Sequence, residues 1–128
     1  MMGTRVYGRP FDDRVGCAIL IEIARTIGDC KHDVYYVFST QEEVGCRGSK
    51  TAAYTVSPDY ALAYDVTGTG DTIGARPMAC KVGDGAAIKI KDSSVVCDRG
   101  LVEIMKKEAE DKKIKHQFAF LIAGGTDT

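Results

Sequence analysis

The chain has 128 residues, with 17 Lys and Arg side chains against 18 Asp and Glu, and a formal net charge of −1. This balance leaves no basic surface for nucleic acid or an anionic membrane, so neither is expected as a partner. No apolar run reaches the roughly 18 residues needed to cross a bilayer, and the first residues lack the apolar core of a secretory signal. We therefore expect a single domain in the cytoplasm.

The first half of the chain predicts two helices and two strands. A helix is expected from Val15 to about Ile27, and its apolar residues point to most sides, so we expect it to be covered. The β-branched and aromatic run Val34–Phe38 predicts a buried strand, and the apolar run Tyr60–Tyr64 predicts a second one. A short helix from Arg47 to Tyr54 is expected between them.

The second half predicts a hairpin, a helix and a last strand. Residues 78–82 and 86–91 are expected to pair as antiparallel strands, because the Asp84-Gly85 step between them suits a tight turn. A helix with one apolar face follows from about Arg99 to Lys112, and residues 117–122 make the last strand. The order of elements predicts an α/β fold with a mixed, mostly parallel sheet flanked by helices.

The cysteines indicate no cross-linked framework. They are odd in number, widely spaced and contain no Cys-x-x-Cys pair, which argues against a set of disulfides and against a structural zinc site. We expect them to be small buried hydrophobic residues. They are Cys17, Cys30, Cys46, Cys80 and Cys97.

Carboxylates stand at the ends of several predicted elements. Asp12 precedes the first helix, Glu42 and Glu43 follow the first buried strand, and Asp65 follows the second. Carboxylates at strand ends can converge, and their repulsion is relieved most simply by a cation. A neighbouring carboxylate that binds no metal could then act as a general base. Alternatively, Glu42 and Glu43 only favour the positive N-terminal end of the following helix.

Four motifs carry a resemblance to a known family. They are Phe11-Asp12-Asp13-Arg14-Val15-Gly16-Cys17, Gln41-Glu42-Glu43-Val44-Gly45, Asp65-Val66-Thr67-Gly68-Thr69-Gly70-Asp71 and Gly124-Gly125-Thr126-Asp127. In order and spacing they resemble the tetrahedral aminopeptidases, a glutamyl-aminopeptidase family of co-catalytic metallopeptidases that includes members labelled cellulase or endoglucanase. The resemblance runs along essentially the whole chain. It implies a zinc-peptidase-like three-layer sandwich, incomplete here, with residues 1–128 as a partial catalytic domain that lacks the dimerisation domain and both terminal regions.

The resemblance also implies roles for individual residues. Asp12 would bridge two divalent metal ions, zinc or cobalt, and the Asp12–Asp13 peptide would be cis. Glu43 would bind one metal ion and Asp65 the other. Glu42 would be the general base, and the reaction would remove the N-terminal residue of a short peptide. A homo-oligomer is the expected assembly.

Two histidine ligands of the family have no counterpart here. His32 and His116 do not match them and are expected on the surface. The remaining ligands are all oxygens, which favour Mg²⁺, Ca²⁺ or Mn²⁺ over zinc, so we expect weak zinc binding and little peptidase activity from this chain alone. Missing neighbouring strands should leave apolar faces uncovered and cause self-association.

Other functions stay open. The chain could be a non-catalytic remnant, or one half of a split enzyme that acts by association with another chain. A glycosidase would need two carboxylates flanking a sugar, a role that Glu42 and Asp65 could fill less well. A nucleotide-binding module is suggested by Gly68-Thr69-Gly70, but the glycine spacing is wrong and Pro77 stands where a helix should open.

Overall fold

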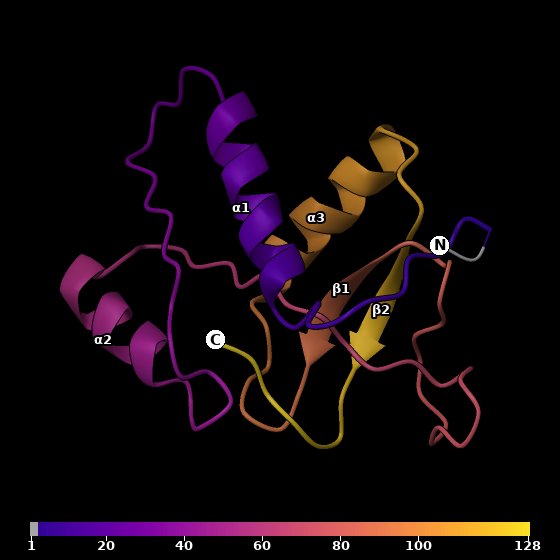
Figure 1. The fold of residues 1–128 in the computed structure, drawn as a ribbon. Coiled ribbons are helices and arrows are strands. Elements are labelled where there is room, and N and C mark those ends of the chain that lie inside the picture. The colour runs from indigo at the N-terminus through magenta and orange to yellow at the C-terminus, as the bar shows by residue number, and fades with distance from the viewer. Residues whose placement is uncertain (1–2) are drawn as a thin grey trace. The chain divides into compact units, whose positions relative to one another are not determined.

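The structure is a computed structural model that describes residues 3–128. Five elements follow one another along the chain (Figure 1): α1 (Arg14–Thr26), α2 (Arg47–Val56), β1 (Ala86–Lys91), α3 (Arg99–Asp111) and β2 (His116–Phe120). The predicted α/β class is confirmed. Across these described residues, no helix combines the length and apolar character needed to cross a membrane.

The chain forms two compact units. Unit 1 contains Met1–Val66 and Thr126–Thr128, and unit 2 contains Thr67–Gly125. Helices α1 and α2 belong to unit 1, whereas both strands and α3 belong to unit 2. Among residues 3–128, the side chains that form the buried hydrophobic core lie in unit 2: Cys80, Ile88, Val102, Ala109 and Ala119.

In unit 1, α1 begins where the sequence predicts it. Asp13 caps the helix, because its Oδ1 accepts a hydrogen bond of 3.0 Å from the Gly16 amide. Gly16 is buried against this carboxylate, and a Cβ there would lie 2.1 Å from Asp13 Oδ2. The expectation that α1 is covered on most sides is wrong. Ile19 and Ile21 are exposed, Ile21 by 52%, because no sheet of unit 1 packs on the helix in the described part of the chain.

The two buried strands expected in unit 1 are also absent from residues 3–66. Residues 34–38 and 60–64 form no strand there, and their side chains are exposed except for the half-buried Tyr36, Tyr35 by 64% and Tyr60 by 75%. Such residues favour a strand only where a neighbouring strand supplies hydrogen-bond partners and an apolar face to pack on. The two runs have the composition of strands, but residues 3–66 contain no neighbouring strand for them.

Unit 2 contains a parallel β-α-β arrangement. Strands β1 and β2 pair in parallel, with Ile88 opposite Phe118, and α3 connects them. Parallel neighbours need such a crossover connection. Val102 and Ala109 form the buried face of α3, so the predicted apolar face of this helix and the predicted last strand are confirmed, each within two residues of its expected ends.

The predicted hairpin is wrong. Residues 78–82 form no strand in the described part of unit 2, and β1 takes β2 as its neighbour instead. Residue Gly85 explains the difference: its φ is +90° and a Cβ there would lie 2.0 Å from the Lys115 carbonyl oxygen. The turn therefore lies against the residue before β2. The Gln117 side chain joins β2 to Lys81, accepting from its amide at 2.9 Å and donating to its carbonyl at 3.1 Å.

The cysteines are free, as expected, but mostly not buried. Only Cys80 is buried, whereas Cys17 and Cys30 are exposed and the other two are half-buried. Their burial was overestimated because unit 1 holds three of the five, and its described residues contribute no side chain to the buried hydrophobic core.

Candidate active site

The backbone around Glu42 is fixed by the helix that follows it. The amides of Gly45 and Cys46 both donate to the Glu42 carbonyl oxygen at 3.0 Å, which closes a turn. At the start of α2, the Gly48 amide donates to the Thr40 carbonyl oxygen at 3.0 Å. Gly48 permits this approach, because a Cβ there would lie 2.6 Å from the Thr40 amide nitrogen. The turn that carries the Glu42-Glu43 pair is thus held at both of its ends.

Two residues of this turn are in the left-handed region. Gln41 has a φ of 63° and Cys46 a φ of 53°, and neither is a glycine. Such backbone conformations are costly and concentrate at functional sites. The first turn of α2 contains no acidic residue, so the turn, and not a place within the helix, sets the position of Glu42 and Glu43.

Negative charges gather around Glu42 within unit 1. Glu42 is half-buried and Glu43 is exposed. Burial raises the pKa of Glu42 above its ordinary value, and nearby carboxylates raise it further, in the order Asp65, Glu43, Asp127 and Asp12. The predicted ligands are therefore near enough to Glu42 for their charges to act on it. Their roles as ligands stay predictions.

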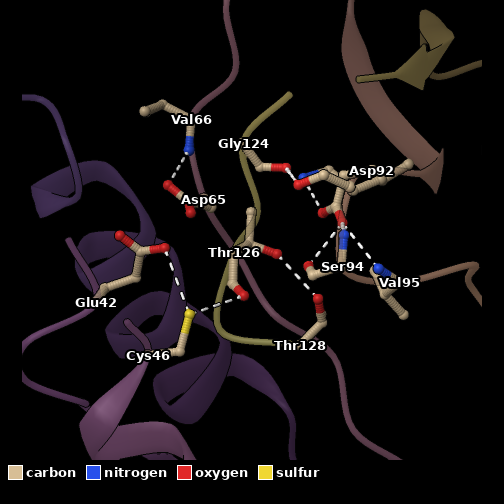
Figure 2. A network of polar contacts seen from close by, with 12 residues as sticks. Glu42, Cys46, Asp65, Val66, Asp92, Ser94, Val95, Gly124, Thr126 and Thr128 are labelled. Carbon is tan, nitrogen blue, oxygen red and sulfur yellow. Dashed lines mark hydrogen bonds and ion pairs between the residues drawn. The ribbon is translucent and has the colours of Figure 1, made fainter. Parts of the chain in front are cut away.

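The aspartates before α1 belong to the same group of charges. The Asp12–Asp13 peptide is cis, as the resemblance implied. Asp12 is exposed and Asp13 half-buried. The pKa of Asp13 is raised by burial, which outweighs the hydrogen bond from Gly16, and by the charges of Asp12 and Asp127. Asp65 is exposed, and its Oδ1 accepts a hydrogen bond of 2.7 Å from the Val66 amide (Figure 2).

The last residues of the chain reach this site, which sequence reasoning did not assign. Asp127 accepts a hydrogen bond from the Ser39 hydroxyl through Oδ2, and its Oδ1 is buried without a hydrogen-bond partner in the described chain. The Cys46 sulfur lies 3.3 Å from the Thr126 carbonyl oxygen (Figure 2). The Gly124–Asp127 motif belongs to the family resemblance, but it does not indicate that these residues contact Ser39 and Cys46.

The residues fit a divalent cation in charge and donor type but do not form a preorganised site. Asp12, Glu43 and Asp65 offer carboxylate oxygens, which suit hard ions, and their mutual repulsion would be relieved by a cation. Within residues 3–128, no group of three or more His, Cys, Asp or Glu side chains is arranged to hold a metal ion. His32 is exposed, as expected, whereas His116 is half-buried at the start of β2, with Nδ1 3.0 Å from the Ile114 carbonyl oxygen.

The described residues combine an α/β fold with a group of carboxylates around Glu42. The M42 glutamyl aminopeptidase family matches residues 1–128, and the chain belongs to this family. The resemblance found in the four sequence motifs is therefore confirmed.

Known relatives support the same assignment. The chain is 42% identical over 127 residues to a putative aminopeptidase of Acetivibrio thermocellus, which covers 99% of this chain and 38% of that protein. It is similar to the solved structure of an aminopeptidase from the archaeon Desulfurococcus kamchatkensis, at 39% identity and a TM-score of 0.81, over 91% of this chain and 34% of that one. It is also similar to PhTET1-12s, a dodecamer in the asymmetric unit, at 34% identity and a TM-score of 0.74, over 93% and 36% of the two chains. The chain thus spans little more than a third of the length of these proteins.

Proposed function

We propose that residues 1–128 form part of the catalytic domain of a metal-dependent aminopeptidase, which removes N-terminal residues from short peptides. The observation that carries this proposal is the group of charges around Glu42, where Asp12, Glu43 and Asp65 all raise its pKa. Membership of the M42 glutamyl aminopeptidase family supports the reaction class.

Glu42 is the general base in this proposal. It is half-buried, and its raised pKa lies closer to neutrality than that of an exposed glutamate, which suits a group that takes up and returns a proton. Glu42 would accept a proton from the attacking water and deliver it to the leaving amine. The turn closed by the Gly45 and Cys46 amides keeps its backbone in place during both transfers.

Asp12, Glu43 and Asp65 would hold two divalent ions. Zinc or cobalt bound there would polarise the scissile carbonyl and lower the pKa of the attacking water. Because these residues offer only oxygen ligands, we expect the isolated chain to bind zinc weakly and to have little activity. The dodecameric relative PhTET1-12s supports a homo-oligomer as the functional assembly. The cytoplasm is the proposed location.

A second candidate function is association with another polypeptide. The exposed residues of the two strand-like runs, such as Tyr35 and Tyr60, together with Ile21 on α1, favour it. In that case the chain would act as one half of a split enzyme, or as a non-catalytic remnant that binds a partner. A glycosidase is less well supported, because the relatives described above are aminopeptidases.

Hydrolysis of aminoacyl-p-nitroanilides, with Mn²⁺, Co²⁺ or Zn²⁺ added, tests the proposal. Glu42→Gln should reduce kcat by about 100-fold or more, the usual contribution of a general base, while calorimetry finds metal affinity retained. Asp12→Asn should instead weaken metal binding. Glu103→Gln, an exposed glutamate of α3, is the matched control and should behave as the unmodified chain.

Three results would count against the proposal. Unchanged turnover in Glu42→Gln would remove Glu42 as the base. Tight stoichiometric zinc binding by the isolated chain would contradict the expected effect of the all-oxygen ligand set. Hydrolysis of a soluble cellulose substrate in place of the anilide would favour the glycosidase.

A further inference from the structure

The Cys46 thiol lies between two groups from distant parts of the sequence. Its sulfur is 3.3 Å from the Thr126 carbonyl oxygen and 3.9 Å from Glu42 Oε1 (Figure 2). A thiol has one weak proton to donate, and at these distances the carbonyl is the closer acceptor and the carboxylate the outer one. The same S–H group is therefore in reach of the proposed base and of the Gly124–Asp127 motif.

Both ends of this contact are anchored in unit 1. Cys46 has a left-handed backbone and donates its amide to the Glu42 carbonyl oxygen, so the turn holds the backbone that carries the sulfur. Thr126 is buried, and its carbonyl oxygen also accepts the Thr128 amide at 2.7 Å. The Thr126 and Thr128 hydroxyls lie 3.2 Å apart. The Thr126 carbonyl oxygen therefore has two neighbouring donors, the Thr128 amide and the Cys46 thiol.

We propose that Cys46 is a positioning residue, whose thiol holds the Glu42 carboxylate and the Thr126 carbonyl in one arrangement. The turn by itself fixes the backbone of Glu42 but leaves the side chain free to rotate. Contact with the thiol restricts that rotation on one side. The consequence for catalysis, that the base points steadily at the reacting water, rests on the proposed function; the contact itself does not.

The electrostatic surroundings of Cys46 suit a donor and not a nucleophile. Burial raises the pKa of the thiol, and the charges of Glu42 and Asp127 raise it further. The thiol therefore stays protonated at neutral pH, whereas reactive cysteines have lowered pKa values. A protonated sulfur keeps the hydrogen that the positioning role needs.

NMR on the whole chain, with the Glu42 side-chain carboxyl and the Thr126 carbonyl carbon assigned, tests the contact. Cys46→Ala removes the donor and should shift both carbon signals, and the hydrogen exchange of the Thr128 amide should become about fivefold faster. Cys46→Ser keeps a donor and should retain both signals near their original positions. Cys30→Ala, which removes an exposed cysteine of the same unit, is the matched control and should shift neither.

Two results would overturn the inference. One is a Cys46→Ala chain in which either carbon signal keeps its place. The other is a Cys46→Ser chain that shifts both signals as Cys46→Ala does, because then the sulfur acts by its volume and not as a donor. Either serine or alanine at this position must adopt the same left-handed backbone as cysteine, so the comparison between them is matched in strain.

Kinetics separates this inference from the proposed function. In the metal-supplemented anilide assay, Cys46→Ala should lower kcat with little change in KM, and Cys46→Ser should restore most of it. Equal kcat in Cys46→Ala and the unmodified chain would refute the catalytic consequence. If the NMR pattern is found but Glu42→Gln turns over the anilide as fast as the unmodified chain, the contact is supported and the proposed role of Glu42 as the base is contradicted.

Discussion

Asp92 is the carboxylate whose contribution to stability can be worked out most directly. It lies in unit 2 directly after β1 and is only 3% exposed. Its Oδ1 accepts hydrogen bonds from the Ser94 amide and hydroxyl, both at 2.8 Å, and from the Val95 amide at 2.9 Å (Figure 2). Its Oδ2 accepts one from Lys89 Nζ at 3.1 Å. Every one of these donors stabilises the ionised form.

Burial alone would raise the pKa of Asp92, but the hydrogen bonds from Ser94, Lys89 and Val95 outweigh it. Together they lower the pKa from 3.8 to about 2. At about 1.4 kcal/mol per pKa unit, this difference corresponds to about 2.5 kcal/mol of stability. Because the folded-state pKa is below the unfolded one, this contribution is fully present above the unfolded pKa. It is lost as the pH falls from about 4 through about 2.

Urea unfolding followed by circular dichroism between pH 7 and pH 2 measures this contribution. Asp92→Asn removes the charge, so at pH 7 it should lower the free energy of unfolding by about 2 kcal/mol. The difference between the two chains should shrink as the pH falls from about 4 towards 2. Asp111→Asn is the control, because that side chain is 63% exposed and should contribute less than about 1 kcal/mol at every pH.

A constant difference between Asp92→Asn and the unmodified chain across this range would refute the reasoning. It would mean that Asp92 stabilises by shape or by neutral hydrogen bonds and not by its charge. Other carboxylates also titrate in the same window, so the comparison between chains, and not the profile of one chain, carries the result.

Two further predictions concern unit 2. Gly85→Ala should destabilise the chain by more than about 2 kcal/mol and disturb β1, because the added Cβ would lie 2.0 Å from the Lys115 carbonyl oxygen at a φ of +90°. Gly83→Ala is the control, because Gly83 has a similar φ of +92° but open space around it, and should cost about 1 kcal/mol. Thermal unfolding measures both losses. Equal losses in the two variants would exclude the close approach as the cause. Asp98→Ala should cost about 1 kcal/mol of stability and lower the helical circular-dichroism signal, because Asp98 caps α3 by accepting a hydrogen bond of 2.9 Å from the Leu101 amide. An unchanged signal and an unchanged midpoint of thermal unfolding would show that this cap is dispensable.

Helices could be located from the sequence because their signals are local. The spacing of apolar residues placed the start of α1 within one residue of Arg14 and the start of α3 at Arg99, and it predicted that α3 has one buried face. Strands depend on partners that the sequence of the strand does not specify. Val34–Phe38 and Tyr60–Tyr64 have a suitable composition but no neighbouring strand in unit 1 as described, so both predictions were wrong.

In the candidate site, too, local features could be predicted from the sequence and contacts between distant residues could not. The sequence motifs led to Glu42 and to three of the carboxylates that raise its pKa, Asp12, Glu43 and Asp65, but not to the fourth, Asp127. The contacts of Cys46 with Thr126 and of Ser39 with Asp127 were missed, because each joins residues at least 80 positions apart. Nothing in the sequence near a cysteine indicates which distant carbonyl it will meet. Contacts of this kind need coordinates.

The exposed Tyr35, Tyr60 and Tyr64 make concentration an experimental variable for this protein. Burying an exposed apolar ring against another surface lowers the free energy of the system. Low protein concentration therefore favours the monomer, and high concentration favours self-association. A synthetic peptide designed to pair with residues 34–38 or with residues 60–64 would compete with self-association through that run. A reduction in light scattering on adding the peptide would show which run contributes more to self-association.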